Sequence, residues 1–316
     1  FALILDDLAG PQDAEVVADR VMEFCRQPIM VEGRPLYLSA SIGIALSGEE
    51  APSAADMLRD AETAMVQAKA GGRSNWRLFE PSMLKAAVSR LDLDSGLRQA
   101  LEEGQFRLHY QPIVDMQSGK LAGVEALARW QHPTRGMIMP SEFIPAAEES
   151  GLILPLGRLI LKEALRQMHA WSVAGAPPDL GMRVNLSPRL LEDPELLPTL
   201  EAALRETPIN VSALQLEVTE SVFMSNRQAA AQVLEQLTAL GPRIAIDDFG
   251  TGYASLSYLH QLPSHVLKID RSFVSRMDGL PENEAVTSAV ITLGHKLGLK
   301  LVADGIETTL PLFRAL

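Results

Sequence analysis

Polar side chains at the ends of short apolar runs are the residues of this sequence whose types and spacing could do chemistry. The runs end in Val124-Glu125, Val184-Asn185, Leu216-Glu217, Ile246-Asp247-Asp248, Leu267-Lys268-Ile269-Asp270 and Ala303-Asp304. Oxygen ligands without a cysteine or histidine cluster favour Mg²⁺, Mn²⁺ or Ca²⁺ over zinc or copper. The adjacent carboxylates of Asp247 and Asp248 could flank two ions, which is the arrangement for in-line displacement at a phosphoester.

These side chains can act together only if the fold brings the ends of the runs to one place. From Phe106 onward, β-rich runs alternate with helical patterns, which is typical of a mostly parallel sheet covered by helices. The expected strands are Arg107–Val114, Leu121–Trp130, Met182–Leu186, Leu214–Val218, Arg243–Ile246, Val266–Ile269 and Lys300–Ala303. The expected helices are Leu154–Val173, Pro194–Arg205, Arg227–Leu240 and Ala285–Leu297.

This alternation predicts an α/β fold, a (β/α)₈ TIM-like barrel whose last unit is missing from this chain. In such a barrel the carboxyl ends of the strands converge on one rim, where barrel enzymes place their sites. A doubly wound open sheet is the alternative fold. It typically carries a glycine-rich phosphate turn after its first strand, and the sequence contains no GxGxxG.

Residues 1–80 show a different pattern and predict a partial α+β domain. The expected order is a strand at Phe1–Leu5, a helix at Asp13–Arg26, a strand within Leu36–Leu46, a helix at Ala54–Lys69 and a strand at Trp76–Phe79. Residues 81–103 are charged and helix-favouring, which suits a linker helix region leading into the barrel domain at residues 91–316.

Composition argues against several functional classes. The 316 residues contain 28 Lys and Arg against 40 Asp and Glu, a net charge of −12, and this surplus of anions argues against a nucleic-acid polymer as partner. The single cysteine, Cys25, excludes a disulfide framework within the chain and a cysteine-rich zinc site. No apolar run reaches the roughly 20 residues of a membrane span. We expect a cytoplasmic piece of a longer protein, with any membrane anchor in segments outside this chain.

Simpler interpretations compete with a shared site. A single carboxylate at a strand end usually caps a helix or lies in a solvated turn, and Asp270 is equally suited to capping the next helix. The same feature on several strands of one alternating array favours a shared site. The histidines show no HExxH spacing, and the lack of a GxSxG elbow argues against a serine hydrolase.

The segment Glu125-Ala126-Leu127, followed by Arg129-Trp130, resembles the signature of EAL-domain cyclic-di-GMP phosphodiesterases. The resemblance runs from about Leu91 to Leu316. Its further segments, in the family's order, are Tyr110–Val114, Pro140–Gly151, Asn185–Ser187, Glu217–Ser221, Asp247–Leu256, Leu267–Asp270 and Asp304–Thr308.

Residues 1–80 resemble the C-terminal half of a GGDEF, or diguanylate cyclase, domain. The matching pieces are Phe1–Leu5, Ser39–Ala45, Asp60–Met65 and Lys69–Asn75. The signature turn of that domain would lie just before Phe1.

The EAL resemblance implies an activity and a set of metal ligands. The family hydrolyses one phosphodiester of cyclic di-GMP to linear pGpG in bacterial second-messenger signalling, using two Mg²⁺ or Mn²⁺ ions, with Ca²⁺ as an inhibitory occupant. The first metal would be held by Glu125, Asn185, Glu217 and Asp247. The second metal would be held by Asp247, Asp248 and Asp304.

Other positions match residues with further roles in the family. The catalytic set carried over is Glu125, Asp248, Lys268, Glu220 and Glu307. Lys268 would lie beside the attacking water and orient it with Asp248. Glu220 would anchor the loop Phe249–Ser255, and Glu307 would support the site and a homodimer formed through the EAL domain. The nucleotide would be contacted by Gln111 and Arg129.

The barrel register gives Lys268 a further expected feature. If the register holds, Lys268 points into the carboxylate rim, and we expect Asp248 or Asp270 to hold its charge.

Two departures from the family pattern leave alternatives open. The family usually has Glu where this chain has Asp304, and the shorter side chain would hold the second metal less tightly. The family's last strand and Gln-Gly turn would lie beyond Leu316. The alternatives to an enzyme are a domain that binds cyclic di-GMP without cleaving it and a dimerisation module without activity.

Overall fold

The computed structural model describes residues 1–31, 34–36, 38–47, 53–70, 74–220, 222–225, 227–249, 263–275 and 281–305. The chain divides into two compact units, Phe1–Ser95 and Gly96–Leu316. Each unit is described by itself below.

The first unit is built from helices and short strand pairs. Its elements are α1 (Pro11–Arg26), β1 (Ile29–Val31), β2 (Arg34–Leu36), β3 (Ile42–Ile44), α2 (Ala54–Ala70), β4 (Trp76–Leu78) and the start of α3 (Pro81–Glu102). Strand β3 runs parallel to β4, and β1 pairs with β2 in an antiparallel hairpin. Gly43 of β3 lies so close to α2 that a Cβ atom would collide with the Ala61 carbonyl oxygen. Glycine at this position therefore permits the strand to pack on the helix.

The predicted strand at Phe1–Leu5 is wrong. These residues have no regular secondary structure, and the side chains of Phe1, Leu3 and Ile4 are exposed. A strand needs a neighbouring strand that pairs with its N–H and C=O groups. Among the described residues β3 pairs with β4 alone, so β3 gives residues 1–5 no partner. The two helices and the strands at β3 and β4 are confirmed, whereas the β1–β2 hairpin was not anticipated.

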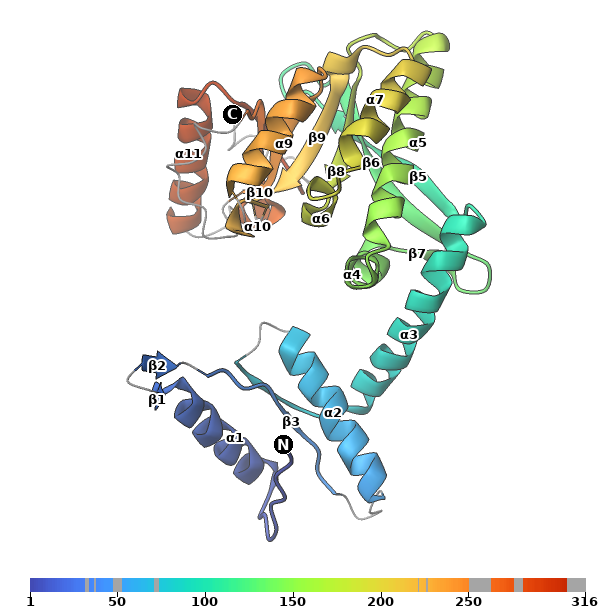
Figure 1. Ribbon diagram of the computed structural model, residues 1–316. Coiled ribbons are helices and arrows are strands. Elements are labelled where there is room, and N and C mark those ends of the chain that lie inside the picture. The colour runs from blue at the N-terminus through green and yellow to red at the C-terminus, as the bar shows by residue number, and fades with distance from the viewer. Residues whose placement is uncertain are drawn as a thin grey trace. The chain divides into compact units, whose positions relative to one another are not determined.

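The second unit is organised around a curled sheet (Figure 1). Its strands are β5 (Phe106–Val114), β6 (Leu121–His132), β7 (Gly136–Ile138), β8 (Gly181–Leu186), β9 (Leu214–Thr219), β10 (Arg243–Phe249), β11 (Val266–Ile269) and β12 (Lys300–Ala303). Their order is β5-β6-β8-β9-β10-β11-β12, with β7 beside β6, and β6 to β12 are parallel along this order. This arrangement is an α/β half-barrel and confirms the predicted TIM-like architecture.

The first strand departs from the parallel pattern. β5 runs antiparallel to β6, from Phe106 opposite Trp130 to Val114 opposite Leu121. Only residues 115–120 join the two strands, and such a short connection permits a hairpin but not a crossover to a parallel neighbour.

Helices connect the strands of this unit. They are α4 (Pro140–Ser150), α5 (Ile153–Val173), α6 (Pro188–Leu191), α7 (Leu196–Glu206), the 3₁₀ turn η1 (Val211–Ala213), α8 (Val222–Ser225), α9 (Arg227–Ala239), α10 (Arg271–Ser275) and α11 (Pro281–Lys296). Figure 1 shows α5, α7 and α9 along one side of the sheet. The four long helices expected in this unit are confirmed, and α4 and the shorter helices were not anticipated. Among the helices of the described ranges, none combines the length and hydropathy that crossing a bilayer requires.

Alternation along the strands separates an apolar face from a polar one. Val184, Leu216 and Val218 are fully buried in the core that the outer helices cover. The residues between them point to the other side of the sheet, because successive side chains of a strand alternate. That inner side carries Glu125, Asn185, Glu217 and Lys268.

Candidate active site

Strand register brings the predicted site residues to the inner face of the sheet. Glu125 on β6 is paired with Arg183 on β8, and Asn185 is paired with Glu217 on β9. Paired residues of neighbouring strands project to the same side. Glu125, Asn185 and Glu217 therefore share a face, as the barrel hypothesis expected.

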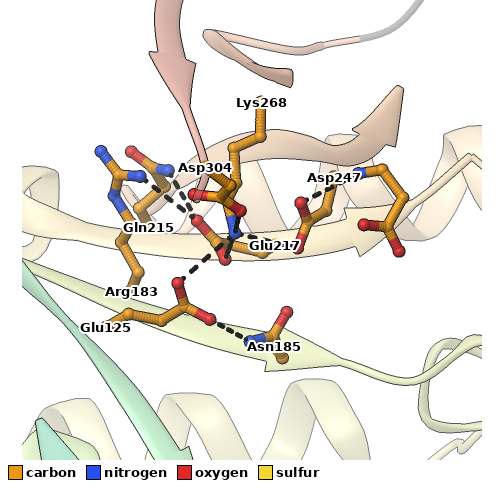
Figure 2. Close-up of polar contacts among 9 residues, drawn as sticks. Glu125, Arg183, Asn185, Gln215, Glu217, Asp247, Lys268 and Asp304 are labelled. Atoms are coloured by element: carbon orange, nitrogen blue, oxygen red, sulfur yellow. Dashed lines mark hydrogen bonds and ion pairs between the residues drawn. The ribbon is translucent and has the colours of Figure 1, made fainter. Parts of the chain in front are cut away.

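Lys268 on β11 lies at the centre of this face. Its side chain is 1% exposed, and its ammonium is surrounded by the four carboxylates that form the carboxylate ring (Figure 2). The distances from Lys268 Nζ are 2.7 Å to Glu217 Oε2, 2.9 Å to Asp247 Oδ2, 3.3 Å to Asp304 Oδ2 and 3.4 Å to Glu125 Oε2. Five strands or strand ends thus supply one cluster of charges.

The expectation that Asp248 or Asp270 would hold the charge of Lys268 is wrong. Asp270 Oδ1 instead accepts a hydrogen bond from the Ser272 N–H at 2.8 Å and caps α10, which bears out the simpler interpretation of this residue. Asp248 has a left-handed backbone, with φ of 53°, at a register shift between β10 and β11. Asp247 is paired with Thr219, two residues beyond Glu217 on β9, so alternation puts Asp247 on the inner face, where it reaches the lysine.

The charges of the ring and of Lys268 shift each other's protonation. Burial alone would lower the pKa of Lys268, but the neighbouring charges, led by Glu217 and Asp247, outweigh it and hold the pKa above its ordinary value. Burial raises the pKa of Glu217 to about 7; Lys268 opposes this rise, and the charges of Glu125 and Asp247 add to it. The lysine is therefore a stable cation, and Glu217 is a carboxylate that holds a proton readily.

Asp248 and Asp304 also have raised pKa values. Loss of solvent is the main cause for both, and the nearby charge of Asp247 adds to it. The Lys268 ammonium opposes the rise at each of them. Asp304 keeps more contact with solvent than the other ring members, since its side chain is 40% exposed.

The donor chemistry of this face fits a hard divalent cation. Its carboxylates outnumber the two cations Lys268 and Arg183, and Asn185 adds an amide that already donates from Nδ2 to Glu125 Oε1 at 2.8 Å. Carboxylate and amide oxygens are the ligands of Mg²⁺ and Mn²⁺. In the described part of the chain no group of three or more acidic, histidine or cysteine side chains is arranged to hold a metal ion; instead, the ring carboxylates face the lysine.

Two residues of this face were missed by sequence reasoning. Arg183 on β8 is 8% exposed and its guanidinium lies 3.7 Å from Glu217 Oε1, while Gln215 Nε2 donates to the same oxygen at 3.3 Å. The signal that could have found them is alternation, because each lies two residues before a recognised site residue, Asn185 or Glu217, on the same strand.

The residues expected to contact a nucleotide lie on the inner face at its first two strands. Gln111 is paired with Glu125, and Arg129 lies four residues further along β6. Glu220 is 5% exposed and directly follows β9. Its predicted partner loop lies, apart from Phe249, outside the described residues, as does Glu307, so these two roles stay predictions.

Family comparisons agree with this architecture. Residues 94–310 match the EAL domain family, and residues 1–75 match the diguanylate cyclase, GGDEF domain family. MucR of Pseudomonas aeruginosa, a bifunctional diguanylate cyclase/cyclic di-GMP phosphodiesterase, is 42% identical over 97% of this chain and 44% of its own length. PdeR of Escherichia coli, a cyclic di-GMP phosphodiesterase, is 37% identical over 97% of this chain and 46% of its own length. The chain thus spans less than half the length of these curated relatives.

Solved structures of the same family resemble the fold. The PaMucR phosphodiesterase in a c-di-GMP complex is 45% identical with a TM-score of 0.67, covering 71% of this chain and 90% of that chain. The FimX EAL domain from Pseudomonas aeruginosa bound to c-di-GMP is 27% identical with a TM-score of 0.64, covering 71% of this chain and 89% of that chain. Together with the matched residues, these likenesses show that the chain belongs to the EAL domain family, with a GGDEF-family segment at residues 1–75.

Proposed function

We propose that the chain hydrolyses one phosphodiester of cyclic di-GMP to linear pGpG, with divalent cations, in bacterial second-messenger signalling. The observation that carries this proposal is the buried Lys268 ammonium within 3.4 Å of four carboxylates on the inner face of the half-barrel. The activity printed for MucR and PdeR supports the choice of substrate.

The cations proposed are Mg²⁺ or Mn²⁺, with Ca²⁺ as an inhibitory occupant. Glu125, Asn185, Glu217 and Asp247 would hold the first ion, and Asp247, Asp248 and Asp304 the second. Such ions, when bound, neutralise phosphate charge and lower the pKa of a bound water. The residues that surround Lys268 supply oxygen donors of the right kind for both positions.

The side chains themselves position the reactants. Lys268 is a fixed positive charge that attracts the phosphate and orients the attacking water. Asp248, whose pKa is raised, is suited to take the proton of that water as its oxygen forms the new bond to phosphorus. The ribose oxygen leaves with the electron pair of the broken P–O bond and takes up a proton. Gln111 and Arg129, on the inner face of β5 and β6, would bind the nucleotide.

A second candidate is a sensor that binds cyclic di-GMP without cleaving it. The observation that favours it is Asp304, whose 40% exposed side chain is the least enclosed of the carboxylate ring. In either case we propose a cytoplasmic domain that forms a homodimer through its EAL part, with any membrane contact made by segments outside this chain.

Incubation of the purified chain with cyclic di-GMP tests the proposal. We expect pGpG to form with Mg²⁺ or Mn²⁺ and to be absent in EDTA or in the Asp247→Asn variant. Calorimetric titration with cyclic di-GMP in Ca²⁺ runs in parallel. Tight binding without product in any metal would establish the sensor, and neither binding nor product would refute both candidates.

A further inference from the structure

Three members of the carboxylate ring, Glu125, Asp247 and Glu217, share one arrangement. One oxygen faces the Lys268 ammonium, and the other is held by a separate donor. Glu125 Oε1 accepts from Asn185 Nδ2 at 2.8 Å, and Asp247 Oδ1 accepts from the backbone N–H of Asp248 at 2.9 Å. These outer donors set the plane of each carboxylate, because two fixed oxygens leave it no freedom to rotate.

Glu217 is held in the same way, but its second oxygen contacts the side chains of Arg183 on β8 and Gln215 on β9. Its Oε2 faces Lys268 at 2.7 Å, and its Oε1 lies 3.3 Å from Gln215 Nε2 and 3.7 Å from an Arg183 nitrogen. Arg183 and Gln215 are paired across β8 and β9. Figure 2 shows both reaching Glu217 from the same side.

Arg183 differs from the outer donors because it is a buried cation that forms an ion pair with Glu217 rather than a hydrogen bond. Its side chain is 10% exposed, and that of Glu217 is fully buried. A guanidinium keeps its proton in proteins, so Arg183 is a permanent positive charge on the face of Glu217 that points away from Lys268. A buried carboxylate needs charged or hydrogen-bonding partners to stay ordered.

We propose that Arg183, assisted by Gln215, is a positioning residue that orients Glu217 for cation binding. The inference rests on the proposed metal-dependent function. Without the guanidinium, Glu217 Oε1 would keep only its 3.3 Å hydrogen bond from Gln215 Nε2, and the carboxylate would be freer to turn both oxygens toward the ammonium. Outer partners of this kind commonly account for 10- to 100-fold in metal affinity.

Calorimetric titration of the whole chain with Mn²⁺ alone tests the inference. We expect Arg183→Met to weaken Mn²⁺ binding roughly 10- to 100-fold and Arg183→Lys to recover part of the loss. In a Glu217→Gln background, Arg183→Met should change the affinity no further, because its effect passes through Glu217. Arg166→Met is the matched control, since Arg166 is 61% exposed and pairs with Glu163 on α5.

Each result bears on the inference. Unchanged Mn²⁺ affinity in a folded Arg183→Met variant would overturn it, as would additive losses in the double variant. A folded wild type that binds no Mn²⁺ would overturn the proposed metal dependence and this inference with it. If the wild type binds Mn²⁺ and folded Arg183→Met binds it equally well, only this inference fails. Should Arg183→Met not fold in thermal melts, Gln215→Leu replaces it, with a few-fold weaker affinity expected and an unchanged affinity contradicting the inference.

Discussion

Leu216 and Glu217 are neighbours on β9 and equally withdrawn from solvent, at 0% and 1% exposure, yet they face opposite sides of the sheet. Leu216 packs among the apolar side chains beneath the outer helices. Glu217 faces the Lys268 ammonium. The outer residue needs only the right volume and apolar surface, whereas the inner one needs partners of definite charge and position.

The apolar residues of the outer face stabilise the domain, whereas the charged residues of the inner face are the ones that can do chemistry. Burying a leucine-sized side chain contributes roughly 1.5–3 kcal/mol. A buried ion pair contributes little net stability, because desolvation offsets the attraction, although removing one partner costs about 3–5 kcal/mol. The outer face therefore supports the fold, and the inner face depends on that support to keep its charges together.

Replacing Lys268 should have the largest effect on the inner face. We expect Lys268→Ala to lower kcat for cyclic di-GMP about 10²- to 10⁴-fold, with a much smaller change in KM, because the lost interaction acts mainly in the transition state. Steady-state rates from separated products measure both constants, and thermal melts confirm folding. Equal losses in kcat and substrate affinity would assign Lys268 to substrate binding.

Shortening Leu216 should have the opposite profile. We expect Leu216→Ala to lower the free energy of unfolding by about 2–5 kcal/mol, because it leaves a cavity in the outer core. The rate per folded molecule should stay within about twofold of wild type, since the side chain points away from Lys268. Urea unfolding and turnover below the transition measure the two quantities. A large loss of kcat in the folded variant would contradict the division between the faces.

Changes at Asp304 should shift the metal requirement. Asp304→Glu should lower the half-saturating Mn²⁺ concentration several-fold, because the longer side chain reaches further toward the proposed second metal. Asp304→Asn should raise it, since a negative charge that balances the cation is lost. Activity titrated with Mn²⁺ measures both shifts. If Asp304→Asn leaves rate and metal dependence unchanged, Asp304 is not a ligand.

The smallest expected effect is a pH dependence of stability. Glu217 keeps its proton more tightly in the folded chain, with a pKa of about 7 against an ordinary 4.5. Protonation of Glu217 therefore stabilises the folded chain at low pH, and this contribution is lost as the pH rises from about 4.5 through about 7. In EDTA, the melting temperature of wild type relative to Glu217→Gln should fall by a few degrees between about pH 5 and pH 8. A constant difference would mean that the pKa of Glu217 is not raised.

Much of the inner face was predictable because the sequence shows where apolar and polar residues alternate and where each strand ends. Glu125, Asn185, Glu217 and Asp247 each follow an apolar residue that packs on the outer side, so the barrel hypothesis alone places them together. The resemblance to the EAL family added their roles, which the proposed experiments test.

Other features depend on contacts that a sequence does not display. The carboxylates around Lys268 are set by strand pairing, because Asp247 is paired with Thr219 on β9 and Asp304 directly follows β12, so the partners of Lys268 were assigned wrongly. Arg183 reads as an ordinary charge in a strand until its pairing with Gln215 is known. At Phe1–Leu5 composition favoured a strand, but strand formation needs a partner, and composition says nothing of one.

The antiparallel start of the sheet has a consequence for the order of folding. Strands β5, β6 and β7 form a meander in which residues 106–138 pair with one another across short turns. Short loops lose the least entropy on closure, so contacts close in sequence form sooner than crossovers between parallel strands. Pulse-labelled hydrogen exchange should therefore find the amides of β6 protected early. Glu125 would then be in place on β6 before β8 and the later strands of the half-barrel pair with it.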